Sequence, residues 1–128
     1  MNILMVDDDR HQVDSIHRGL LVHGHAGLGL GAAQARAFLA GAEARAVDVL
    51  VVDLSVPAPD RLALLVWARQ ARPSLASLVL AGLATPPELE EALALPVPVL
   101  RKPFDAGHLD RAIREAFGAH SKLPGGTP

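Results

Sequence analysis

The residues best suited to chemistry are acidic and basic side chains that follow short aliphatic runs. Asp7 and Asp8 come directly after one such run, Asp53 comes directly after a second, and Lys102 comes shortly after a third. In an open parallel sheet, ligands bind at the carboxyl ends of the strands. If the three runs are strands of one sheet, these carboxylates and the lysine meet at the same edge.

Converging carboxylates repel one another unless a cation compensates them. Their hard oxygens, with room for water, suit Mg²⁺ better than zinc or copper. A carboxylate is also a nucleophile that can form an aspartyl phosphate, and phosphoryl transfer needs mainly positioning and charge neutralisation. A single aspartate after a strand more often caps the next helix. Several carboxylates and a lysine at three strand ends favour a site.

The elements that position these side chains are short aliphatic runs alternating with segments of helical spacing. The runs are residues 3–6, 26–30, 47–52, 75–80 and 97–100. Such alternation predicts an α/β fold, in which a parallel sheet is covered on both faces through right-handed crossovers. We therefore predict a (βα)5 doubly wound, five-stranded, flavodoxin-like sheet of order 2-1-3-4-5, which makes the first and third strands neighbours.

The helical pattern is clearest near the C-terminus, where apolar residues recur along one helix face. That stripe is Leu109, Ala112, Ile113, Ala116 and Phe117. Prolines predict a short helix over residues 87–95. We predict one domain over residues 1–119, followed by a flexible C-terminal tail or the start of a linker over residues 120–128.

The composition excludes several classes of function. The chain has 128 residues, a net charge of −2 and no cysteine. Its basic residues form no stripe that could neutralise a nucleic-acid backbone, and no apolar run approaches the roughly 20 residues needed to span a bilayer. These properties predict a soluble cytoplasmic protein that binds neither nucleic acid nor membrane.

Three motifs, taken in order and spacing, resemble the response-regulator receiver family of two-component signalling. The motifs are Val6-Asp7-Asp8, Val52-Asp53-Leu54-Ser55-Val56-Pro57 and Lys102-Pro103-Phe104. The resemblance implies that Asp53 is the phosphoacceptor and that Lys102 binds the phosphoryl group. It implies a Mg²⁺ cofactor whose ligands are Asp7, Asp8, Asp53 and the backbone carbonyl of Ser55. It also implies a cis peptide bond between Lys102 and Pro103.

The same resemblance implies a function and a set of partners. A histidine kinase or phosphotransfer protein would donate the phosphoryl group, and the domain would relay the signal to a partner, an output domain or a second copy of itself. Such a domain catalyses only its own phosphorylation and dephosphorylation, so we do not expect an enzyme with a turnover substrate.

Three positions depart from the receiver pattern. Ala81 replaces the usual Thr or Ser after the fourth strand, Val99 replaces an aromatic switch residue, and Arg61 replaces a glycine. The backbone amide of Gly82 can still bond a phosphoryl oxygen. The alternative function is therefore an atypical receiver-like module that binds proteins independently of phosphorylation.

Two further patterns have functional and ordinary interpretations. The segment 61–68 is apolar almost all round, and alignment with the family directs Val66 and Trp67 outward, which predicts an interface with another chain.

The segment 27–32 fits G-x-G-x-x-A and leaves open a nucleotide- or flavin-dependent enzyme, although a glycine-rich edge strand is the commoner interpretation. We expect the histidines near residues 11–25 to be solvated.

Overall fold

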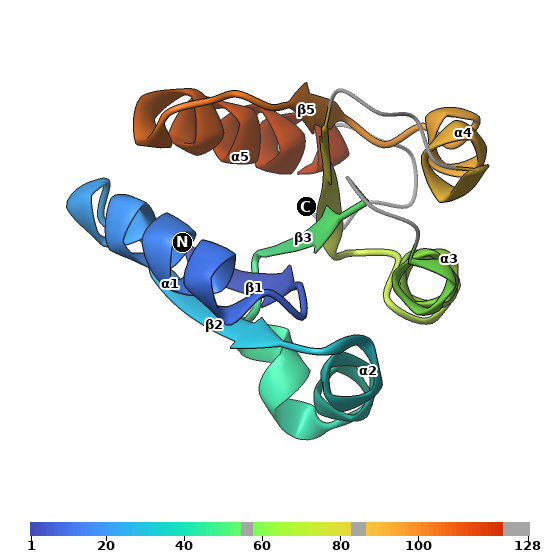
Figure 1. Cartoon of the computed structure of the whole chain (residues 1–128). Helices are drawn as coiled ribbons and strands as arrows, with labels where there is room; N and C mark the ends of the chain where they lie inside the picture. The colour runs from blue at the N-terminus through green and yellow to red at the C-terminus, as the bar shows by residue number, and fades with distance from the viewer. Residues whose placement is uncertain (55–57, 83–86, 122–128) are drawn as a thin grey trace.

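The computed structural model describes residues 1–54, 58–82 and 87–121, which form a parallel sheet between two layers of helices (Figure 1). The strands are β1 (Asn2–Val6), β2 (Ala26–Leu30), β3 (Val49–Asp53), β4 (Ala76–Ala81) and β5 (Val99–Arg101). The helices are α1 (Arg10–Val22), α2 (Ala32–Ala40), the 3-10 helix η1 (Ala42–Ala46), α3 (Pro59–Ala71), α4 (Pro87–Leu93) and α5 (Ala106–Ser121).

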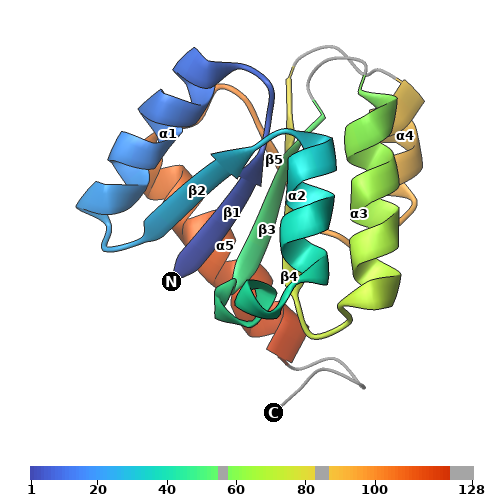
Figure 2. The same ribbon diagram turned by 90° about the horizontal axis from the view of Figure 1, so that it is seen from below.

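The strand order is β2-β1-β3-β4-β5, and every neighbouring pair is parallel, which confirms the predicted fold. Figure 2 shows β2, β1 and β3 side by side. Val6 at the end of β1 lies opposite Val52 of β3, so the residues that follow them emerge together. The last strand begins at Val99, later than predicted, because Pro98 has no N–H to donate to the ladder.

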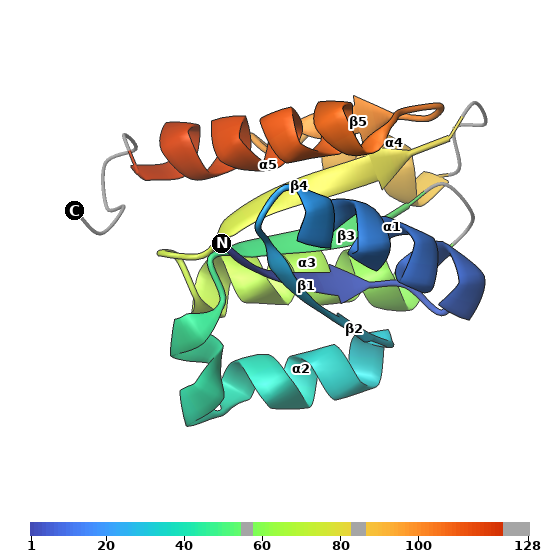
Figure 3. The same ribbon diagram turned by 90° about the vertical axis from the view of Figure 1, so that its left-hand side faces the viewer.

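Two apolar cores cover the two faces of the sheet. One core joins α1 and α5 to the sheet, and the other joins α2, α3 and α4 to the opposite face. Figure 3, seen from the side of α1 and α5, shows these helices in front of the strands and α3 behind them. The central strands β3 and β4 are buried along their whole length, which explains why they read as continuous aliphatic runs.

The glycine-rich segment is the edge strand β2, as predicted. A Cβ atom at Gly29 would lie 2.3 Å from Val13 Cγ1, and one at Gly27 would lie 2.8 Å from His17 Nδ1. These glycines let α1 pack directly on the strand. Close packing thus accounts for the glycines without a bound dinucleotide.

The predicted apolar face of α5 is correct except at its end. The stripe on α5 buries Leu109, Ile113 and Ala116, whereas Phe117 is 41% exposed and lies at the margin of the core. Helix α4 ends at Leu93, two residues earlier than predicted, and α5 continues to Ser121. Residues 122–128 of the predicted tail lie outside the described residues. No helix in the described part of the chain is both long and apolar enough to cross a membrane.

The expectation of a solvated histidine is wrong for His25, which is 1% exposed. Its Nδ1 lies 3.0 Å from the Met1 ammonium and its Nε2 lies 2.6 Å from Asp110 Oδ1 on α5. An ammonium can only donate, so Nδ1 accepts and the Nε2–H donates to Asp110. This bond, with help from Arg114, lowers the pKa of Asp110. The burial of His25 could not be predicted from the neighbouring sequence, because His25 and Asp110 are 85 residues apart.

We predict that His25→Phe lowers the free energy of unfolding by about 1–3 kcal/mol, because the ring volume is kept while two partly buried polar partners lose their hydrogen bonds to the buried imidazole. Chemical denaturation monitored by circular dichroism measures the change. His11→Phe, at an exposed position of α1, is the matched control and should remain near wild type. Equal stability of His25→Phe and wild type would contradict the structural role of this network.

Candidate functional site

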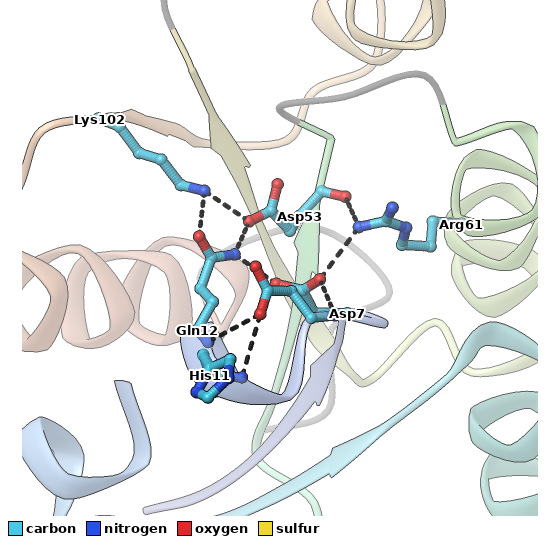
Figure 4. Close-up of polar contacts among 7 residues, drawn as sticks. Asp7, His11, Gln12, Asp53, Arg61 and Lys102 are labelled. Atoms are coloured by element: carbon cyan, nitrogen blue, oxygen red, sulfur yellow. Dashed lines mark hydrogen bonds and ion pairs between the residues drawn. The ribbon is translucent and has the colours of Figure 1, made fainter. Parts of the chain in front are cut away.

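The carboxyl edge of the sheet brings together three of the predicted site residues (Figure 4). Asp53 is the last residue of β3, Asp7 follows β1 and Lys102 follows β5. The two aspartates are almost fully buried, at 1% exposed for Asp53 and 6% for Asp7. Their position follows from the sheet order, since β1 and β3 are neighbours.

Lys102 provides a cation to the buried acceptor. Its Nζ lies 2.8 Å from Asp53 Oδ2 and donates a second bond of 2.6 Å to Gln12 Oε1. The Lys102 backbone N–H donates to the carbonyl of Ala81 at 2.7 Å, which fixes the residue beside the end of β4. The Lys102-Pro103 peptide bond is cis, as the receiver resemblance predicted.

Gln12 is a central residue that the sequence analysis missed. Its side-chain amide donates to the carboxylates of both Asp7 and Asp53. The residue lies in the first turn of α1, whose cap Asp9 accepts from the Gln12 N–H at 3.2 Å. The spacing Asp9-x-x-Gln12 is a capping-box pattern and so marked a helix start at this edge. It did not indicate that the amide would face the acidic pair.

Arg61 lies in the first turn of α3 and is 7% exposed. Its guanidinium Nη1 donates to the main-chain oxygen of Asp53 at 2.9 Å and lies 3.4 Å from Asp7 Oδ1. In the sequence, Arg61 was distinguished only by standing where the receiver pattern has a glycine. A charged residue at the start of the apolar segment 61–68 was the available signal, because buried charges need partners.

The electrostatics of Asp7 reflect its burial. Burial is the main factor that raises the pKa of this carboxyl, and the nearby charge of Asp53 raises it further. Hydrogen bonds from the Asp9 N–H and Gln12, together with the Arg61 charge, act in the opposite direction. The net shift is upward, so ionising Asp7 costs more free energy in the folded chain than in water.

We predict that Asp7→Asn raises the melting temperature in metal-free buffer at neutral pH. Because the folded pKa is raised, ionised Asp7 reduces stability above that pKa, and the penalty disappears as the pH falls through it. The substitution should remove the penalty at every pH. Thermal unfolding in the presence of a chelator tests this, with Asp14→Asn at an exposed position of α1 as control. A lower melting temperature would mean that the Arg61 pair outweighs burial.

The predicted metal ligands are only partly assembled. Asp8 is exposed, and a Cβ added to Gly31 would lie 2.9 Å from Asp8 Oδ1, so this carboxylate faces the start of α2. Among the described residues, no group of three acidic, histidine or cysteine side chains is arranged to hold a metal. Ser55 lies outside the described residues. Asp7 and Asp53 nevertheless fit a hard cation, since one oxygen of each converges on the single amide nitrogen of Gln12.

The positions that depart from the receiver pattern lie beside the site. Ala81 ends β4 and is fully buried, with Gly82 directly after it, and Val99 is a half-buried residue that starts β5. Their roles stay predictions.

The predicted interface residues lie on α3. Val66 is 40% exposed, whereas Trp67 is half-buried under the Arg36 guanidinium, 4.9 Å from its ring centroid. Trp67 therefore has a partner within its own chain. Whether this face binds another chain stays a prediction.

The fold is that of response-regulator receiver domains. A receiver domain protein from Clostridium thermocellum superposes with a TM-score of 0.78 at 24% identity, covering 96% of this chain and 98% of that one. A receiver protein from Sinorhizobium medicae WSM419 gives 0.76 at 26% identity, covering 94% and 96%. NtrX from Brucella abortus gives 0.77 at 24% identity, where the match covers 94% of this chain but 27% of NtrX. No protein-family model and no curated protein matches the sequence.

Proposed function

We propose that this receiver-fold chain is the phosphoacceptor domain of a two-component signalling system and that Asp53 takes up the phosphoryl group. The observation that carries the proposal is the position of Asp53 at the end of the central strand, with Lys102 Nζ 2.8 Å from its carboxylate and Asp7 beside it. The domain would modify only itself, so it is not an enzyme in the usual sense.

In the proposed reaction, a carboxylate oxygen of Asp53 attacks the phosphorus of a phosphohistidine. The new O–P bond forms as the N–P bond of the donor breaks, and the imidazole leaves with the electron pair and takes a proton from solvent. Lys102 is placed to bind the phosphoryl oxygens as negative charge develops on them. The Gly82 backbone N–H is the proposed donor to a further oxygen.

Mg²⁺ is the proposed cofactor, with Asp7, Asp8, Asp53 and the Ser55 backbone carbonyl as its ligands. When bound, the ion neutralises charge on the transferring group. Gln12 has to leave the two carboxylates first, and Asp8 has to turn away from Gly31.

The proposed donor is a histidine kinase or a phosphotransfer protein in the cytoplasm. The signal would pass to a partner protein, to an output domain or to a second copy through Val66 and Trp67. The formal charge of −2 disfavours direct binding of nucleic acid. We propose no membrane partner.

We predict that the purified chain gains one phosphate from acetyl phosphate or a cognate kinase in the presence of Mg²⁺. Intact-mass spectrometry detects the adduct, and Asp53→Asn should abolish it because the nucleophilic oxygen pair is lost. Asp60→Asn, at an exposed position in the first turn of α3, removes the same charge nearby and should still be modified. Folded protein that gains no phosphate from either donor would contradict the proposal.

The atypical positions favour the second candidate, a receiver-like module that docks proteins independently of phosphate. Ala81 has no hydroxyl to follow a phosphoryl group inward. A lost charge-assisted hydrogen bond is worth about 1.5–3 kcal/mol, similar to a typical allosteric coupling of about 1–3 kcal/mol. Val99 is compact and has one stiff torsion, so it offers no inward and outward pair of states.

We therefore predict that a beryllofluoride phosphate mimic shifts the amide NMR signals of β5 and its adjoining helices only slightly in the wild type. The double variant Ala81→Thr with Val99→Tyr should show larger shifts, because it restores the hydroxyl and the mobile aromatic ring. Large wild-type shifts through α4, β5 and α5 would show that these two positions do not weaken the switch.

A further inference from the structure

Arg61 is a cation built into the acidic edge of the sheet. Its side chain is 9% exposed and contacts one carboxylate oxygen of Asp7 and the main-chain oxygen of Asp53. We propose that Arg61 competes with the divalent cation for the carboxylates of Asp7 and Asp53, so that the domain has a charge-compensated resting state without metal and binds Mg²⁺ weakly. This inference rests on the proposed function and concerns the control of the same site.

The formal charges at the site are already balanced without a metal ion. The carboxylates of Asp7 and Asp53 face the cations of Arg61 and Lys102, at 3.4 Å and 2.8 Å respectively. Two negative charges are thus met by two positive charges. A divalent ion at these carboxylates gains less attraction than it would beside the carboxylates and Lys102 alone, because the nearby guanidinium repels it.

Both carboxylate oxygens of Asp7 already have partners in the resting structure. Asp7 Oδ1 accepts from the Asp9 N–H at 3.0 Å and faces Arg61, while Asp7 Oδ2 accepts from Gln12. Gln12 is neutral and partly exposed, so its amide can swing into water at little electrostatic cost. Arg61 is charged, nearly buried and anchored on a strand carbonyl. Arg61 is therefore the group that sets the resistance to metal entry.

A purely structural role for Arg61 makes a different prediction. The bond to the Asp53 carbonyl also fastens the start of α3 to the end of β3. If fastening were its whole role, its replacement would lower stability and leave the affinity for Mg²⁺ unchanged. Metal binding therefore separates the two roles, whereas a melting temperature alone does not.

The experiment titrates the full chain with MgCl₂ by isothermal calorimetry in wild type, Arg61→Gln, Arg61→Lys and Arg69→Gln. Arg61→Gln removes the charge and keeps a polar amide at this position, and it should lower the Kd for Mg²⁺ about tenfold or more. Arg61→Lys retains the charge and should stay within about threefold of wild type. Arg69→Gln, in the last turn of the same helix, changes the net charge equally and should leave the Kd unchanged.

Circular dichroism confirms that each variant is folded, and Arg61→Met serves as a second charge-removing variant if Arg61→Gln does not fold. If charge removal tightens Mg²⁺ binding no more than Arg69→Gln does, the inference is overturned, and phosphate uptake by wild-type Asp53 keeps the proposed function intact. If no form binds Mg²⁺, the inference is likewise overturned. Failure of wild type and Arg61→Gln alike to take up phosphate would separately overturn the proposed function.

Discussion

The structure depends on the burial of two carboxylates at one edge of a parallel sheet. Asp53 and Asp7 are almost inaccessible to water, and ionised carboxylates in such surroundings need hydrogen bonds and opposite charges. These come from three segments that are distant in the sequence: Gln12 in α1, Arg61 in α3 and Lys102 after β5. The compensation is complete only when the crossovers between these segments have folded.

The sheet meets this constraint through its topology. Parallel strands buried on both faces leave their carboxyl ends as the place where polar groups collect. Helices α1 and α3 also start at this edge, so their first turns can direct Gln12 and Arg61 into it. Along α1, Gly29 faces Val13 and Gly27 faces His17, and the absence of side chains at these glycines lets the helix lie close to β2. The glycine-rich strand thus helps to position the helix that supplies Gln12.

The sequence allowed the strand order and the meeting of Asp7, Asp53 and Lys102 to be predicted, because aliphatic runs and strand ends are local signals. Side-chain direction is not local. Asp8 is adjacent to Asp7 but faces the start of α2, and His25 is buried because a partner arrives from α5. Such outcomes depend on tertiary neighbours, which spacing along one segment does not encode.

Under the proposed function, the resting balance of charges has a consequence for signalling. A phosphoryl group carries about 1.5 to 2 negative charges, but the Asp53 carboxylate loses its own charge when the O–P bond forms, so the site gains about 0.5 to 1 negative charge beyond what Arg61 and Lys102 already match. Ala81 provides no hydroxyl, so the new charge has to be met by these cations, by backbone N–H groups or by the metal. Arg61 is fixed to the first turn of α3. A response carried by electrostatics therefore acts first on α3, in place of the path from β4 to β5 that Ala81 and Val99 weaken.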